Sequence, residues 1–305
     1  MMKSKMQRKW MLMKRNWLLY VFVVPCLLYI LIFHYLPLYG IQMAFKDFNA
    51  YDGIWGSPWV GFAHFNRFFQ SVQFWSLIRN TLALSLYQLV VGFPMPILLA
   101  LMLNYTSLKR TKRLVQTVTY APHLISTVVI VGMLIAFTSS SGLFNQLLAI
   151  FGKEPILFMG KSSLFRSLYV WSDVWQNTGW SAIIYIAVLT SVNQELHEAA
   201  IVDGASILRR IWHIDLVAIL PTAIILLIMN LGSVMNLGFE KAFLMQNSMN
   251  LDASEIISTY VYKIGIQSTQ YSYATAIGLF NNIINFILLI SVNRIARSVS
   301  GTSLW

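Results

Sequence analysis

The stretch EAAIVDGASILRRIWHIDL, residues 198–216, separates two long apolar runs and is the most informative part of this chain. It carries acidic and basic side chains, whereas the neighbouring runs carry almost none. Gly204 permits a sharp bend there, because glycine adopts positive φ without steric cost. The pattern therefore predicts two short helices, over residues 195–203 and 206–216, that form a knob outside the bilayer.

The second of these predicted helices has an apolar stripe. Ile207, Ile211 and Ile214 recur at i, i+4 and i+7, which is the spacing of one helical face, while the neighbouring arginines take other positions. Such a face is suited to a groove on a partner protein. The same periodicity also suits a helix lying on the membrane surface, for which Trp212 and two arginines are typical. Periodicity alone leaves both interpretations open.

The composition of the whole chain indicates a membrane protein. Of its 305 residues, 57% are hydrophobic and only 11% are charged, whereas soluble domains are about 25% charged. A chain with so few charges cannot solvate its surface in water, but a bilayer requires an apolar exterior. The net charge of +11 is spread over loops between apolar runs. We therefore expect no nucleic-acid partner.

Six apolar runs are each long enough for a helix to cross the bilayer, which takes about 20 residues. They cover residues 17–38, 77–103, 114–137, 167–191, 217–237 and 271–292. Prolines that mark kinks or helix ends lie within or beside them at positions 25, 37, 94, 96, 122 and 221. The predicted fold class is all-α, a polytopic bundle of six transmembrane helices.

The distribution of basic residues predicts the orientation. Six of them precede the first run, and positive charge favours the cytoplasmic side. That first run is too long for a signal peptide and lacks a small-residue cleavage site, so we expect it to be retained. We predict a cytoplasmic N-terminus over residues 1–16, a transmembrane domain over 17–294 with a cytoplasmic loop over 192–216, and a cytoplasmic tail over 295–305. The expected location is a prokaryotic cell membrane.

No catalytic or metal-binding pattern is found in the sequence. Gly160-Lys161-Ser162 matches the end of a P-loop, but Pro155 occupies the position of the required upstream glycine. The five histidines lack ligand spacing, the single Cys26 excludes an intrachain disulfide, and no nucleophile motif is present. We therefore predict a protein that is not an enzyme and that binds neither metal nor cofactor. Any ATP is hydrolysed by another chain.

Residues 198–216 resemble the cytoplasmic coupling loop of ABC importer permeases. In that loop Glu-Ala-Ala is followed by a glycine and then by Ile-x-Leu, as Gly204, Ile214 and Leu216 follow Glu198 here. The similarity covers almost the whole chain and includes NWLLYVFVVPCLLYILIFHYLPLYGIQMAFKDF (16–48), GSPWVGFAHFNRFF (56–69), VQTVTYAPHLIS (115–126) and NLGFEKAFLMQN (236–247). The family's Ile-x-Leu-Pro ending differs here, because Val217 follows Leu216 and the next proline is Pro221.

The resemblance implies a maltose-type, type I importer permease, closest to the subgroup that imports oligosaccharides or polysaccharide fragments. Its partners are then two ATP-binding-cassette subunits that use ATP and Mg, a second homologous permease in a heterodimer, and an extracytoplasmic solute-binding protein. Glu198 is expected to make a polar contact with the ATPase, and the small residues after it allow close approach. The residues expected to couple this chain to the ATPase are Glu198, Ala199, Ala200, Asp203, Gly204, Ile214 and Leu216.

Substrate recognition is predicted mainly in the fourth run. Trp171 and Trp175 lie one helical turn apart, as do Asp173 and Asn177. Sugars are bound by aromatic faces combined with polar groups. The alternative is an interfacial aromatic belt with hydrogen bonds between helices. The same two interpretations apply to two asparagines of the last run, Asn281 and Asn285.

The rival function is an ion-coupled secondary sugar transporter, which needs no ATPase. Such transporters usually show internal repeats with broken helices at matching positions. Neither feature is seen in the two halves of this sequence, which favours the importer permease.

Overall fold

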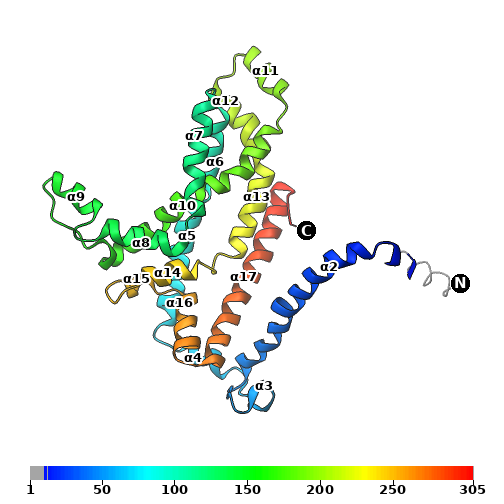
Figure 1. The fold of residues 1–305 in the computed structure, drawn as a ribbon, viewed down its shortest axis with the longest axis vertical. Coiled ribbons are helices and arrows are strands. Elements are labelled where there is room, and N and C mark those ends of the chain that lie inside the picture. Colours follow the sequence, from blue (N-terminus) through cyan, green and yellow to red (C-terminus); the bar gives the residue numbers. More distant parts are fainter. Residues whose placement is uncertain (1–9, 12, 305) are drawn as a thin grey trace.

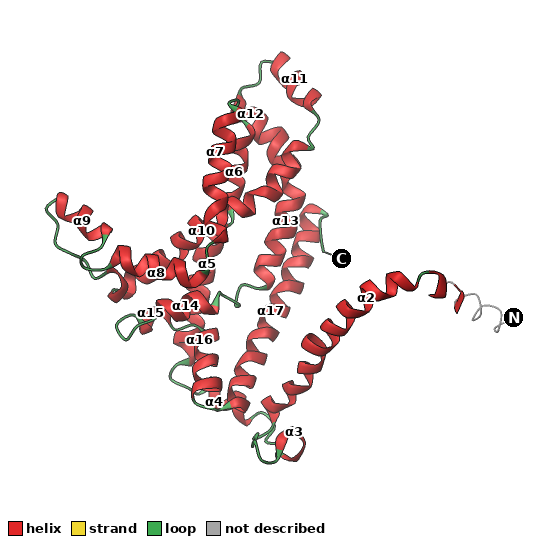
Figure 2. Ribbon diagram, viewed as in Figure 1, coloured by secondary structure: helices red, strands yellow, loops and turns green. Residues whose placement is uncertain are grey.

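The computed structural model describes residues 10, 11 and 13–304, and helices form nearly all of the regular structure in that part of the chain (Figure 2). One isolated antiparallel bridge joins Lys46 and Trp59. The all-α prediction is confirmed. Of the six basic residues in the predicted cytoplasmic N-terminus, four lie outside the described residues, as does Trp305 of the predicted cytoplasmic tail.

Five described stretches are long and apolar enough to cross a membrane: Trp17–Phe45, Phe74–Asn104, Thr127–Ile150, Ile207–Gly232 and Tyr271–Ser300.

The first stretch is a continuous helical rod. Helix α2 (Trp17–Ile30) passes through a π-helical turn, η1 (Leu31–Tyr35), into a 3-10 helix, η2 (Leu36–Phe45). No residue of α2 is buried against the rest of the chain, and in Figure 1 this helix leans away from the others. In contrast, η2 packs against the last helix, α17 (Tyr271–Ser300). Only the end of the first predicted span is therefore anchored within this chain.

The second predicted span is formed by α5 (Phe74–Gly92) and α6 (Pro94–Asn104), which are separated by Phe93 alone. Pro94 is the first residue of α6, a position that needs no backbone N–H donor. The two helices thus follow one another almost without interruption.

The third predicted run, over residues 114–137, is not one helix as expected. Helix α7 (Lys109–Tyr120) ends in a 3-10 turn, η3 (Ala121–Leu124), and α8 (Thr127–Thr138) begins after extended backbone at Ile125 and Ser126. Pro122 lies at the break, where it removes a backbone donor. The Ser126 hydroxyl then accepts a hydrogen bond from the Val129 amide at 3.4 Å and begins α8.

The break at Pro122 changes the direction of the chain. Helix α7 packs against α10 (Ser162–Thr190), whereas α8 and the following α9 (Leu143–Ile150) project to one side of the bundle (Figure 1).

Helix α10 (Ser162–Thr190) forms almost all of the fourth predicted run. It packs against α5, α6, α7 and α13. It is too polar to be among the five apolar stretches. It approaches α7 closely at Gly179, where a Cβ atom would lie 2.1 Å from the backbone oxygen of Thr119. Small residues permit such close packing between membrane helices.

The segment over residues 198–216 is only partly as predicted. Helix α11 (Gln194–Val202) confirms the first short helix, and Gly204 has the positive φ, +74°, of a sharp bend. The second helix is not separate. Instead α12 (Ile207–Arg210), the π-helical η5 (Ile211–Asp215) and α13 (Leu216–Gly232) follow without a gap. Val217 does not interrupt a helix as a proline does, so the fifth span continues into the knob.

The remaining described helices lie between the spans. They are α3 (Gly53–Gly56), α4 (Ala63–Phe69), the 3-10 helix η4 (Phe158–Gly160), α14 (Phe239–Met245), α15 (Leu251–Ser254), α16 (Ile257–Tyr262) and the π-helical η6 (Lys263–Gln267). Clusters of buried apolar side chains join α5, α8, α10 and α14, then α6, α10 and α13, and finally α4, α5, α16 and α17. Helix α10 belongs to two of these clusters.

We predict that Gly179→Ala destabilises the fold, because the added methyl group meets the α7 backbone. Overpacking of this kind costs about 1–3 kcal/mol, so the detergent-purified protein should unfold several degrees below the unsubstituted chain in a thermal shift assay. The matched control is Gly132→Ala in α8, where an added Cβ has no neighbour within 4 Å. Equal melting temperatures for the two variants would contradict the close α7–α10 contact.

Candidate functional site

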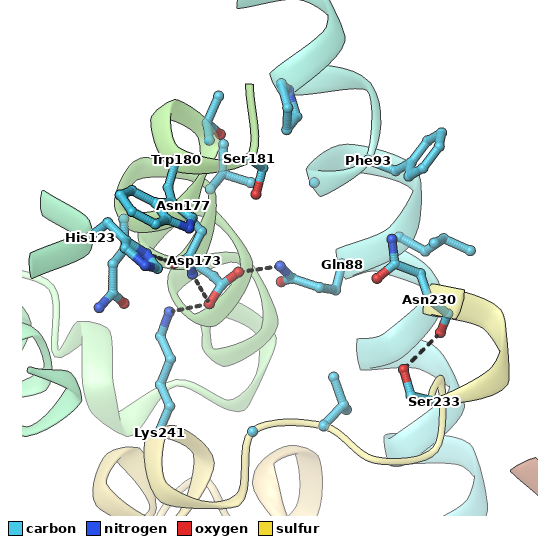
Figure 3. A pocket seen from close by; sticks show the side chains of 18 of the residues that line it. Gln88, Phe93, His123, Asp173, Asn177, Trp180, Ser181, Asn230, Ser233 and Lys241 are labelled. Atoms are coloured by element: carbon cyan, nitrogen blue, oxygen red, sulfur yellow. Dashed lines mark hydrogen bonds and ion pairs between the residues drawn. The ribbon is translucent and has the colours of Figure 1, made fainter. Parts of the chain in front are cut away.

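A cavity of about 1220 Å³ lies between α5, α6, α10, α13 and the segment that leads into α14 (Figure 3). Its wall combines apolar side chains with amides, hydroxyls and a few charged groups. The polar and aromatic side chains on this wall include Gln88, His123, Asp173, Asn177, Trp180, Asn230, Asn236 and Lys241. Such a mixture of apolar surface and convergent polar groups is typical of a ligand site.

Asp173 of α10 is the centre of a polar cluster on this wall. Its carboxylate accepts hydrogen bonds from the side-chain amides of Gln88 and Asn177, the latter at 3.0 Å. The Lys241 ammonium lies 3.4 Å from the same carboxylate and 5.0 Å from the centre of the Tyr169 ring. Lys241 is only 4% exposed, and a buried charge of this kind needs a partner. Asp173 therefore holds the start of α14 against α10 (Figure 3).

Asn177 extends this cluster across the cavity. Its Oδ1 atom lies 2.9 Å from Nδ1 of His123, which comes from the η3 turn at the break in the third predicted run. The His123 ring in turn stacks on Trp180, with 4.7 Å between the ring centres and an angle of 10°. The cavity thus presents one stacked aromatic pair beside a row of hydrogen-bonding groups.

The structure brings together only part of the predicted substrate-pathway set. Asp173 and Asn177 line the cavity. Trp171 and Trp175 do not line it, although they lie on the same helix, and about half of each side chain is exposed. The Trp171 indole donates a hydrogen bond to the Tyr87 hydroxyl at 3.1 Å. The i, i+4 spacing of the two tryptophans placed them on one face of α10, but that face is not the cavity wall.

Asn281 and Asn285 of α17 are buried behind the cavity wall. Asn281 donates a hydrogen bond to the Asn236 side chain at 2.7 Å, and Asn285 accepts one from the Met235 amide at 3.0 Å. These contacts fix the connection after α13, and Asn236 itself lines the cavity. Both asparagines thus contact the segment that forms the wall.

Several cavity residues have no predicted role. Trp180 could have been predicted from the sequence, because it follows Asn177 by three residues on a helix and so shares its face. For Gln88, His123 and Lys241 the sequence offers no comparable local pattern. They come from α5, η3 and α14, and only the fold brings these elements together.

The predicted coupling residues lie in two places, at the exposed tip of the knob and at its base. Helix α11 lies at one extreme end of the molecule (Figure 1). There Glu198, Ala199, Asp203 and Gly204 are exposed, and Ala200 is partly buried. Around them lie large exposed apolar side chains, namely Leu196, Ile201, Val202, Ile207 and Leu208. Apolar side chains gathered on an exposed tip are typical of a protein contact.

Ile214 and Leu216 lie further from the tip. Both are partly buried, and Leu216 packs against the cluster that joins α6, α10 and α13. The structure therefore places these two residues at the base of the knob, where it enters the bundle.

Comparisons with known proteins agree with this architecture. Residues 92–301 match the family described as the binding-protein-dependent transport system inner membrane component. The chain is 44% identical over 294 residues to Protein LplB of Bacillus subtilis (strain 168), with 96% of this chain and 92% of that protein covered. It is 42% identical over 297 residues to the polygalacturonan/rhamnogalacturonan transport system permease protein YteP of the same strain, with 96% and 92% covered.

Two solved structures have the same fold. One is a crystal structure of a bacterial ABC transporter involved in the import of the acidic polysaccharide alginate. It has a TM-score of 0.89 and 40% identity, and 96% of this chain and 99% of that chain are covered. The other is a bacterial alginate ABC transporter in complex with an alginate pentasaccharide-bound periplasmic protein. Its TM-score is 0.89 at 39% identity, with 97% of this chain and 100% of that chain covered.

The matched family segment spans more than half of the chain, and the similarity to the solved permeases extends over nearly all of it. The fold is therefore that of a type I ABC importer permease, and the chain is a multi-pass protein of the inner membrane. It belongs to the family of binding-protein-dependent transport system inner membrane components.

Proposed function

We propose that this chain is one of two permease subunits of an ATP-driven importer for an oligosaccharide or polysaccharide fragment. The observation that carries the proposal is the cavity of about 1220 Å³, in which the stacked His123–Trp180 pair lies beside the Asp173 cluster. Aromatic faces with adjacent hydrogen-bonding groups are suited to sugar rings and their hydroxyls. The names of the relatives support this class of cargo, because they refer to polygalacturonan, rhamnogalacturonan and alginate.

The proposed topology has six spans with both termini in the cytoplasm. The five apolar stretches and α10 provide the helices. With 29 residues α10 is long enough for a bilayer despite its polarity. The proposed orientation is supported by α7, whose basic start lies at the same end of the bundle as α11 and α12 (Figure 1). Basic residues favour the cytoplasmic side.

The proposed energy source is ATP hydrolysis by two partner subunits that bind ATP and Mg. The exposed tip of α11, with Glu198 and its apolar neighbours, is the proposed contact with one of them. A second, homologous permease provides the matching half of the pathway and completes a heterodimer. Closure of the two ATPases then draws the two knobs together, and the cavity alternates between the two sides of the membrane. A solute-binding protein delivers the sugar from outside.

Within the cavity, we assign the hydrogen bonds to sugar hydroxyls to Asp173, Asn177 and their partners. Trp171 and Trp175 stay candidates for an outer part of the same pathway, and Asn281 and Asn285 for its support. This assignment is supported by the lining of the cavity, which includes Asp173 and Asn177 but neither the two tryptophans nor the two asparagines of α17.

We predict that Gly204→Val weakens association with the ATPases and abolishes most ATP-driven uptake. Valine is strained at a φ of +74°, so the bend that presents α11 cannot persist. The matched control is Gly152→Val, because Gly152 has a similar φ of +67° and equally open surroundings but lies in the loop after α9. The measurement is co-purification of the ATPases, followed by uptake in proteoliposomes.

Glu198→Gln tests the polar contact at the same tip, with Glu154→Gln in the outer loop as its control. Normal ATPase association of the Gly204 and Glu198 variants would contradict the assignment of α11. Sugar uptake by the isolated chain in an ion gradient would contradict the whole proposal and favour a secondary transporter.

We predict that Asn177→Ala reduces uptake at low sugar concentration, because it removes a hydrogen-bonding group from the cavity. A lost neutral hydrogen bond is worth about 0.5–1.5 kcal/mol, which corresponds to at most roughly a tenfold fall in kcat/KM for transport. Asn66→Ala on the exposed face of α4 is the control and should leave uptake unchanged. Equal kcat/KM values for both variants would show that the sugar does not contact this wall.

A further inference from the structure

Asp215 is a buried carboxylate at the base of the knob. Its side chain is fully buried, although it lies at the junction of η5 and α13 and two other residues of the same turn, Trp212 and His213, are exposed. A buried carboxylate is costly unless its oxygens are hydrogen-bonded or paired. The groups around it therefore indicate what it does.

Three elements meet at this carboxylate. From the end of α6, the Tyr105 hydroxyl donates a hydrogen bond to Oδ2 at 2.6 Å, and the Asn104 amide donates to Oδ1 at 3.5 Å. From α11, Nε2 of His197 lies 3.4 Å from Oδ1. The Arg210 guanidinium lies 5.4 Å from the centre of the Tyr105 ring. Burial and the hydrogen bond to Asp215 both raise the pKa of Tyr105, so its hydroxyl stays protonated and able to donate.

His197 has a special position on α11. Of the nine residues of this helix only His197 and Ala200 are partly buried, and the other seven are exposed. His197 also lies edge-on to the Tyr105 ring, with 6.5 Å between the ring centres. Its contact with Asp215 is thus the polar attachment of α11 to the bundle.

The two spans held by Asp215 both reach the cavity. Helix α6 contributes Pro96 to the cavity wall, and α13 contributes Leu226 and Asn230. Because a helix is stiff along its axis, a displacement at Asp215 moves these wall residues as well. If α11 moved alone, Oδ1 of the buried carboxylate would keep only the long contact with Asn104, which is unfavourable.

We infer that His197 and Asp215 are positioning residues that link movement of α11 to α6 and α13, so that ATPase closure changes the cavity. This inference rests on the proposed function, because it assumes that α11 binds an ATPase. Neither residue belongs to the Glu-Ala-Ala and glycine pattern or to the predicted coupling set. Asp215 occupies the variable position between Ile214 and Leu216.

The experiment uses the whole complex of both permeases and the ATPases in proteoliposomes with the binding protein. It compares His197→Ala, Asp215→Asn and the double variant with the unsubstituted complex, and measures sugar taken up and ATP hydrolysed in the same sample. We expect the amount of sugar transported per ATP to fall about tenfold in each single variant, within the range of coupling between contacting residues. The double variant should be no worse than either single variant, and His197→Gln, which keeps a donor, should restore part of the ratio.

The control is His213→Ala, because His213 is exposed on η5 and bonds only locally to the Arg209 carbonyl at 3.0 Å. A merely structural role predicts less assembled complex but an unchanged ratio of sugar to ATP, and that result would overturn the inference. The inference would also be overturned if the double variant lowered the ratio of sugar to ATP by the product of the two single effects, because the two residues would then act independently. Failure of the proposed function looks different, because the unsubstituted complex itself would then show no ATP-dependent uptake.

Discussion

A bilayer offers no water to satisfy polar groups, so polar side chains within a membrane bundle must bond to other protein groups or face a cavity. This constraint explains the centre of the bundle. Asp173 and Asn177 bond to groups from α5, η3 and α14, and the Gln176 amide donates to the Ile125 carbonyl at 3.0 Å. Gly179 allows α7 to approach closely enough to cover this helix. The interrupted run of α7, η3 and α8 thus supplies hydrogen-bonding partners for the polar side chains of α10, and these bonds in turn hold the interrupted run against α10.

Helix packing also connects the base of the knob with the cavity. Helix α13 begins at the base of the knob and its later residues line the cavity, and α6 and α13 share one cluster of buried apolar side chains. Pro221 is accommodated within α13, and the π-helical turn at Ile211–Asp215 precedes it. Deviations of this kind are frequent at functional positions of long helices. Packed helices, and not loops, therefore connect the base of the knob with the cavity.

Much of the fold followed from hydrophobic runs and prolines, because length and apolarity are dictated by the bilayer. The first, second, fourth and sixth runs correspond closely to observed helices, whereas the fifth, predicted over residues 217–237, is helical only as far as Gly232. The run over residues 114–137 was expected to be one helix and is two, since Pro122 and the Ser126 cap outweigh its apolarity. The helix expected to end near Leu216 continues to Gly232, because Val217 is compatible with helical backbone.

The sequence by itself determined the class of protein, the exposed knob and the likeness to importer permeases, because these depend on local composition and on a short motif. Only the tertiary structure decided which polar residues share the cavity. Trp175 and Asn177 are two positions apart on one helix but face different surroundings. His123, Lys241 and Gln88 reach Asn177 or Asp173 from distant segments. The same is true of Asp215. Its partners are Tyr105 at the end of α6 and His197 on α11, so they reach its carboxylate only when the three helices pack together.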